Sequence, residues 1–169
     1  AGFINKVPEI VKEFGNEFTV ATVGTIKVTP HSVNVIPGTC TFSLEIRDQS
    51  AEVMKLIENH LRRLLEDICK KYGVTSTFVP TSYHDPAPMS ELVRGTIEEA
   101  VKELGIDYTV IPSGAFHDSL IMTSVFPTGM IFVPSKDGIS HSRYEYTAPE
   151  DIENGCNVLL NTVLKLDEK

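Results

Sequence analysis

Two histidines occupy similar positions in the second half of the chain, each shortly after a run of apolar residues. The runs 108–111 and 130–133 have the length and composition of buried strands, and each leads through Pro, Ser and Gly to His117 or His141. Neutral histidine is the commonest protein ligand of zinc. Because loops that leave the carboxyl ends of parallel strands form the ligand-binding crevice of an open α/β sheet, we expect both histidines to face one pocket.

Asn34 and Arg47 are candidates for binding an anion. Arginine presents a planar fork that matches a carboxylate with two hydrogen bonds, and an asparagine amide adds another donor. Arg47 falls on the polar side of an alternating run at 40–47, where an ordinary exposed sheet residue is the alternative. The residue types permit carboxylate binding but do not establish it.

Ser113, His117 and Asp118 contain the three residue types of a serine hydrolase triad. The segment around Ser113 lacks the Gly-x-Ser-x-Gly turn that presents such a nucleophile. An adjacent His and Asp also cannot easily align one behind the other. A nucleophilic serine is therefore the weaker hypothesis for these residues.

Hydrophobic spacing predicts the elements that would hold these side chains. Apolar residues at intervals of three to four predict helices at 3–15, 50–72 and 90–104, each followed by a glycine stop signal. A last helix is predicted to open with Thr147 and Glu150 as a capping box. Its apolar face would carry Ile152, Cys156, Leu159, Val163 and Leu166. β-branched or alternating residues predict strands at 18–28, bent at Gly24, at 40–47 and at 74–79.

The element order predicts two regions that meet near the Pro-rich segment 82–88. Residues 1–83 follow the order helix, strand, strand, helix, strand, which is a βαββαβ ferredoxin-like unit without its first strand. Residues 84–169 alternate helices with short buried strands, as in an α/β layer. The predicted fold class is therefore α/β (α+β), with the strands at 18–28 and 39–47 adjacent in one sheet.

The composition is that of a globular protein and argues against several classes. The 169 residues are 41% hydrophobic, enough to bury a core, and the formal net charge of −8 argues against a nucleic-acid-binding surface. Three scattered cysteines favour free thiols in a reducing compartment over disulfides or a cysteine zinc site. No apolar run approaches the roughly 18–20 residues that span a bilayer, and the first residues lack a signal-peptide pattern. We therefore expect a cytoplasmic protein with no membrane or nucleic-acid partner.

Three sequence blocks in order resemble a known enzyme family. They are Val-Asn-Val-Ile-Pro-Gly at 33–38, Ser-Gly-Ala-Phe-His-Asp-Ser at 113–119 and Val-Pro-Ser-Lys-Asp-Gly-Ile-Ser-His-Ser at 133–142. The chain resembles, over essentially its whole length, the dinuclear zinc amidohydrolases that include N-carbamoyl-L-amino acid hydrolase, allantoate amidohydrolase and β-ureidopropionase. These belong to the aminoacylase and carboxypeptidase metallopeptidase superfamily.

The resemblance also implies a domain assignment. Family members are more than twice as long as this chain, and their N-terminal half carries most of the metal ligands. The chain is therefore expected to be a C-terminal fragment. Residues 1–83 would be part of a lid and dimerisation domain, and residues 84–169 the C-terminal part of a zinc-exopeptidase-like catalytic domain.

The resemblance implies a role for each candidate side chain. His141 would be a metal ligand, and His117 would contact the substrate and stabilise the tetrahedral oxyanion. Asn34 and Arg47 would bind the substrate's carboxylate. Glu145 is a candidate for orienting the metal-bound histidine from the second coordination sphere, and a solvated loop glutamate is its equal alternative.

The chain departs from the family pattern at several positions. Phe116 stands where the family has a small glycine, and Ser119 replaces an alanine. The second block continues His-Ser-Arg-Tyr-Glu where the family commonly has His-Ser-Pro before its Glu. A bulky ring beside the site leaves the pocket size, and hence the substrate, open.

The resulting expectation is metal-dependent hydrolysis of a linear amide or ureido C–N bond by the complete protein. Two divalent ions, zinc or manganese, would act on a small carboxylate substrate such as an N-carbamoyl amino acid or allantoate, in a homodimer formed through the lid. The fragment alone would bind no stoichiometric metal and would be inactive. The alternative is a non-catalytic small-molecule-binding or dimerisation module, which differs in needing no metal.

Overall fold

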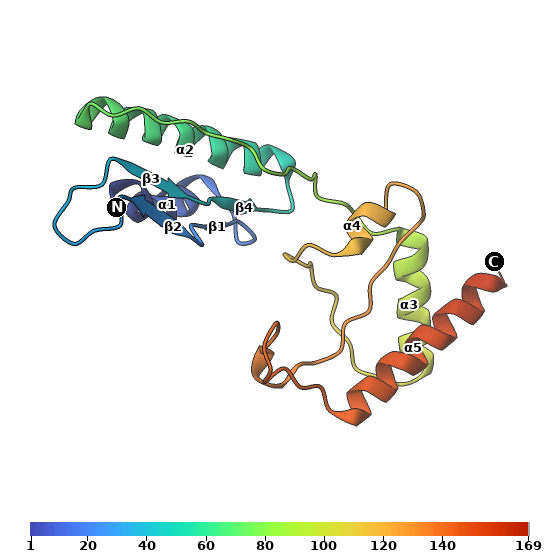
Figure 1. Cartoon of the computed structure of the whole chain (residues 1–169). Coiled ribbons are helices and arrows are strands. Elements are labelled where there is room, and N and C mark those ends of the chain that lie inside the picture. Colours follow the sequence, from blue (N-terminus) through green and yellow to red (C-terminus); the bar gives the residue numbers. More distant parts are fainter. Residues whose placement is uncertain (169) are drawn as a thin grey trace. The chain divides into compact units, whose positions relative to one another are not determined.

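The computed structural model describes residues 1–168 and divides into two compact units, Ala1–Pro86 and a second that begins at Ala87 (Figure 1). Each unit has its own helices and its own buried residues. Among the described residues, none of the helices combines the length and the apolar character that a bilayer crossing needs. The roles expected of the two regions, lid and catalytic layer, stay predictions.

In the first unit, two helices pack together, as predicted. Helix α1 spans Gly2–Phe14 and α2 spans Ala51–Tyr72. The Ser50 hydroxyl caps α2 by accepting a hydrogen bond from the Val53 N–H at 3.3 Å, and Gly73 ends it in the left-handed region at φ 65°. The core consists of Phe3 and Val7 from α1 with Ile57 and Leu61 from α2.

Four short strands, which follow α1 and precede α2 along the chain, form an antiparallel ribbon. They are β1 (Val20–Thr22), β2 (Ile26–Thr29), β3 (Thr39–Phe42) and β4 (Glu45–Arg47). β1 pairs with β4 and β2 pairs with β3, so the two runs are neighbours as predicted, but they form two two-stranded sheets instead of the single sheet that was expected. Apolar side chains of the ribbon, including Phe42, Leu44 and Ile46, pack against the helix core.

The break in the ribbon is a bulge at the predicted bend. Thr22 pairs with Glu45 and Ile26 with Phe42, so three residues on one side face two on the other. The Ser43 hydroxyl accepts a hydrogen bond from the Thr25 N–H at 3.0 Å, and the Ser43 N–H donates to the Thr25 carbonyl at 3.1 Å. These two bonds satisfy backbone groups that the interrupted ladder leaves over.

The strand predicted at 74–79 is absent from the structure. Val74 and Val79 are exposed, and the segment returns along α2, where the Arg62 guanidinium lies 3.6 Å from the centre of the Phe78 ring (Figure 1). An extended segment becomes a strand only when a neighbouring strand takes up its N–H and C=O groups. Because this segment contacts the helix and pairs with no described strand, the ferredoxin-like arrangement is not confirmed.

The second unit is built on the packing of α3 (Glu91–Glu103) against α5 (Pro149–Asp167). Its buried residues are Thr96, Ala100 and Val101 from α3 and Val158 and Thr162 from α5. Each buried threonine hydroxyl donates to the carbonyl four residues earlier, Thr96 at 2.9 Å and Thr162 at 2.7 Å. Two polar side chains therefore enter this core with their hydrogen bonds made.

The start and the buried face of α5 differ from the prediction. Ala148, not Thr147, is the N-cap, because Pro149 fits the first helical position, where no N–H is needed. No side chain caps this end, so the predicted capping box does not form. The apolar face predicted for this helix is largely exposed, including Ile152, Leu159 and Val163, since α3 contacts the face that carries Val158 and Thr162.

The runs 108–111 and 130–133 are extended but are neither strands nor buried, contrary to the prediction. Tyr108, Val110, Ile111 and Phe132 are all exposed. Buried parallel strands need neighbours from distant parts of a chain, and these runs have none among residues 1–168. The structure therefore does not supply the sheet edge on which the common crevice for both histidines was expected.

Candidate functional site

His117 lies where the chain turns into the short helix α4 (Asp118–Met122). Its ring is partly buried, and its Nε2 atom is 2.8 Å from the Ser113 hydroxyl oxygen. The Phe132 ring lies beside the imidazole, with 5.5 Å between ring centres at an angle of 60°. Two neighbours from different segments thus limit how the imidazole can turn.

The structure brings Ser113 to His117, two residues that the weaker serine hydrolase hypothesis had grouped together. The Ser113 oxygen also accepts a hydrogen bond from the Ala115 N–H at 3.3 Å, so the segment folds over the serine. His117 occupies the N-cap position of α4, but its side chain makes no capping hydrogen bond. The neighbour that sequence reasoning missed is Phe132, which lies 15 residues further along the chain and has no local signal that links it to His117.

His141 is exposed on a loop that is closed by Glu145. The loop follows the 3-10 turn η1 (Lys136–Gly138), and His141 itself has a left-handed backbone at φ 55°. Its N–H donates to the Glu145 carboxylate at 2.8 Å, and the Glu145 N–H donates to the Ser142 carbonyl at 3.0 Å. Glu145 therefore holds the backbone of His141, not its ring, and leaves the imidazole facing solvent.

The described residues do not by themselves fit a metal pair. Across 1–168 there is no group of three His, Cys, Asp or Glu side chains placed to hold a metal ion. A catalytic zinc needs about three protein ligands and an open position. An exposed imidazole such as that of His141 suits one of those positions, and the other donors would have to come from outside the described residues.

Arg47 and Asn34 belong to the first unit but lie at opposite ends of its ribbon (Figure 1). Arg47, at the end of β4, donates from Nε at 3.0 Å and from Nη2 at 2.8 Å to one oxygen of Glu45. Asn34 lies in the loop between β2 and β3, where its side-chain oxygen accepts a hydrogen bond from the Ser32 hydroxyl at 2.7 Å. The eight steps from Thr39 to Arg47 span about 26 Å at the usual rise per residue.

This separation prevents Asn34 and Arg47 from contacting one carboxylate in the conformation described. Each can still bind an anion separately, since both are exposed. An anion at Arg47 would compete with Glu45, whose ion pair with Arg47 is half exposed and hence weak.

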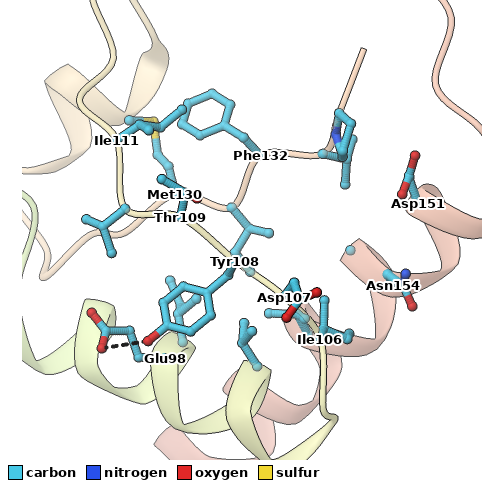
Figure 2. Close-up of a pocket in the computed structure, with 18 of the residues that line it drawn as sticks. Glu98, Ile106, Asp107, Tyr108, Thr109, Ile111, Met130, Phe132, Asp151 and Asn154 are labelled. Atoms are coloured by element: carbon cyan, nitrogen blue, oxygen red, sulfur yellow. Dashed lines mark hydrogen bonds between the residues drawn. The ribbon is translucent and has the colours of Figure 1, made fainter. Parts of the chain in front are cut away.

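A cavity of about 580 Å³ lies within the second unit between α3, α5 and the two extended runs (Figure 2). Its few polar groups include Glu98, whose carboxylate is 3.3 Å from the Tyr108 hydroxyl. None of Asn34, Arg47, His117, His141 and Glu145 lines it. Apolar residues of the runs 106–111 and 130–134 form much of its wall, together with charged or polar residues of the helices that include Arg94, Asp151 and Asn154.

The chain belongs to a family of metallohydrolases, because the model described as peptidase family M20/M25/M40 matches residues 6–165. The family is generally metal-dependent. An N-carbamoyl-L-amino acid amidohydrolase of Geobacillus stearothermophilus is 40% identical over 166 residues, which are 98% of this chain and 40% of that protein. An allantoate amidohydrolase of Bacillus subtilis (strain 168) is 34% identical over 145 residues, 86% of this chain and 35% of that protein.

A solved structure supports the same assignment. The crystal structure of AtUAH in complex with (S)-hydroxyglycine has a TM-score of 0.92 and 33% sequence identity, covering 99% of this chain and 40% of that chain. The chain therefore spans 40% or less of the length of these three proteins. The relatives are hydrolases, and the non-catalytic alternative is not favoured.

Proposed function

We propose that the complete protein hydrolyses the amide or ureido C–N bond of a small carboxylate-bearing substrate, such as an N-carbamoyl amino acid or allantoate. The observation that carries this proposal is the 40% identity to an N-carbamoyl-L-amino acid amidohydrolase across 98% of the chain. The held imidazole of His117 and the exposed guanidinium of Arg47 supply side chains of the right chemistry.

Two divalent metal ions, zinc or manganese, are proposed as the cofactor. His141 would be one ligand, with its imidazole presented by the loop that Glu145 closes at 2.8 Å. When bound, such ions make water a nucleophile near neutral pH. The remaining ligands would come from a region of the complete protein that corresponds to the part of the longer relatives that this chain does not match.

His117 is proposed to stabilise the oxyanion that forms when the carbonyl is attacked. This role requires a hydrogen-bond donor fixed in place before the charge develops. The contacts of its ring with Ser113 and Phe132 support it, since a side chain that is already oriented loses little freedom in the reaction.

Arg47 is proposed as the principal group that binds the substrate's carboxylate. Its Nε and Nη2 atoms already donate two hydrogen bonds to one carboxylate oxygen of Glu45, so the guanidinium is in a position to pair with a carboxylate. Asn34 would reach the same carboxylate only through movement of the loop between β2 and β3, or from a second copy of the chain. A homodimer through the first unit is also proposed, because the strand edges of its ribbon are open to pairing.

Hydrolysis by the complete protein tests the proposal. The protein is stripped of metal with a chelator and assayed for ammonia release from an N-carbamoyl-L-amino acid, allantoate and 3-ureidopropionate, before and after zinc or manganese is added. The expected result is metal-restored hydrolysis of at least one of the three. Absence of turnover on all three with either metal would contradict the proposed substrate class.

A further inference from the structure

The Ser113 hydroxyl contacts one ring nitrogen of His117. A serine hydroxyl has one proton to donate and two lone pairs that accept. One lone pair of the Ser113 oxygen is used by the Ala115 N–H at 3.3 Å. The only other partner of this hydroxyl that the structure shows in residues 1–168 is the Nε2 atom of His117, at 2.8 Å.

This pair can take two arrangements. If Nε2 carried the proton, it would donate to the serine oxygen, and Nδ1 of the neutral ring would have no proton to donate. If the hydroxyl donates to Nε2, the proton of the neutral imidazole lies on Nδ1, which is then the donor available to a substrate, as the proposed role of His117 requires. The tautomer of a histidine follows from the hydrogen bond that its other nitrogen makes.

We propose that Ser113 is a positioning residue that holds neutral His117 in the Nδ1–H tautomer, so that Nδ1–H is the group that donates to the substrate. The adjacent Phe132 ring restrains the imidazole from a second side, so the direction of the donor is fixed together with its identity. The consequence of this tautomer for catalysis rests on the proposed function, whereas the tautomer itself is a property of this chain.

Proton-nitrogen correlation NMR of the histidine rings tests the tautomer directly. The spectrum is recorded at alkaline pH, where free histidine is neutral, and the His117 signals are those lost in His117→Gln. The expected wild-type pattern has a protonated Nδ1 and an unprotonated Nε2. Ser113→Ala should shift the pattern towards a protonated Nε2, and Ser113→Thr, which keeps a hydroxyl, should restore it.

The matched control is Ser124→Ala. The Ser124 hydroxyl donates to the carbonyl of Ile121 at 2.8 Å, in the same stretch of chain but away from the imidazole. This variant should leave the His117 signals unchanged. A wild-type His117 with its proton on Nε2, or a pattern that does not change in Ser113→Ala, would overturn the proposal.

Kinetics of the complete protein separate this proposal from the proposed function. Ser113→Ala should lower kcat by about 10-fold to 100-fold with KM little changed, because a misdirected donor affects the transition state more than binding. Ser113→Thr should recover most of that loss. A covalent acyl adduct on Ser113 would overturn the proposal in favour of a nucleophilic serine. If the tautomer behaves as expected but His117→Gln keeps full activity, the positioning role stands and the catalytic role of His117 is wrong.

Discussion

Each histidine of the second unit is held by a residue four positions away, but through a different part of its structure. Ser113 contacts the ring of His117 at 2.8 Å, whereas Glu145 accepts a hydrogen bond from the backbone N–H of His141 at 2.8 Å. The first contact orients a ring nitrogen. The second fixes a left-handed backbone that is unusual for a residue other than glycine. It therefore fixes the backbone position from which the His141 side chain projects.

Replacement of Glu145 should therefore loosen His141. Glu145→Ala removes the acceptor of the His141 N–H, while Glu145→Gln keeps a side-chain oxygen that can accept the same bond. We expect faster amide hydrogen exchange at His141 in the alanine variant and near wild-type exchange in the glutamine variant. The control is Glu153→Ala, an exposed position on α5. Unchanged exchange in Glu145→Ala would show that this loop does not depend on the carboxylate.

Asp48 has a comparable role in the first unit, where its carboxylate links the turn before β1 to the start of α2. Its carboxylate accepts hydrogen bonds from the Thr19 hydroxyl, the Ser50 N–H at 2.8 Å and the Asn16 amide at 3.2 Å. Partial burial raises the pKa of Asp48, but these hydrogen bonds outweigh it together, so that the pKa lies below its ordinary value.

The lowered pKa gives Asp48 a pH-dependent contribution to stability. A carboxylate with a lowered folded-state pKa stabilises the fold above its unfolded-state pKa, about 3.9, and loses that contribution as the pH falls through the folded value. Asp48→Asn should lower the free energy of unfolding by about 1 kcal/mol at pH 7, allowing for its solvent exposure. In urea unfolding, the difference from wild type should shrink below about pH 4. Glu17→Gln, at an exposed position, should show no such difference; an Asp48→Asn deficit that is equal at pH 7 and pH 3 would exclude the electrostatic explanation.

At the scale of elements, two helix glycines differ in what surrounds them. A Cβ atom added at Gly155 of α5 would lie 2.5 Å from the Cγ1 atom of Val133, whereas one added at Gly95 of α3 would have no atom within 4 Å. Gly155 therefore lets the run 130–133 lie directly on α5. No such contact requires a glycine at position 95.

Alanine at these two positions should have opposite effects on thermal unfolding. Gly95→Ala should stabilise the chain by about 0.5–1 kcal/mol, the usual gain from removing a glycine inside a helix. Gly155→Ala should destabilise it by about 1 kcal/mol, because a clash with the stiff Val133 side chain exceeds that gain. Equal stabilisation by both variants, measured by circular dichroism, would show that the run 130–133 does not pack on α5.

Elements set by local residues could be predicted from the sequence, and elements that need distant partners could not. The ends of α2 were correct because Ser50 and Gly73 are local signals for a helix start and stop. The strands predicted at 74–79, 108–111 and 130–133 do not form. Apolar or β-branched composition permits a strand but does not provide the neighbouring strand with which it must pair. The start of α5 was wrong by one residue, since the preference of Pro149 for the first helical position outweighed the Thr147 cap.

The candidate site was predictable only in part, for a related reason. The opening of α4 after His117 follows from its local sequence, but the approach of Ser113 and Phe132 to the imidazole depends on how two separate segments turn. The separation of Asn34 from Arg47 follows from the pairing of β2 with β3 and of β1 with β4, which places the connecting loop and the end of β4 at opposite ends of the ribbon.

At the scale of the whole molecule, each unit carries residues with a different proposed role. Arg47 of the first unit is proposed to bind the substrate, whereas His117 and His141 of the second unit are proposed to act on the transition state and on the metal. The chain spans 40% of the N-carbamoyl-L-amino acid amidohydrolase that it matches, so this division of work is a proposal for the complete protein.

Steady-state kinetics of the complete protein test that division most directly. On a carboxylate-bearing ureido substrate, Arg47→Ala should mainly raise KM, by an amount equivalent to about 2–4 kcal/mol of lost charge-assisted binding. His117→Gln should mainly lower kcat, by about 10²–10³-fold. Arg63→Ala, at an exposed position on α2, should change neither constant. If Arg47→Ala left KM unchanged, Arg47 would not bind the substrate's carboxylate, and the assignment would reduce to a metallohydrolase of unspecified substrate.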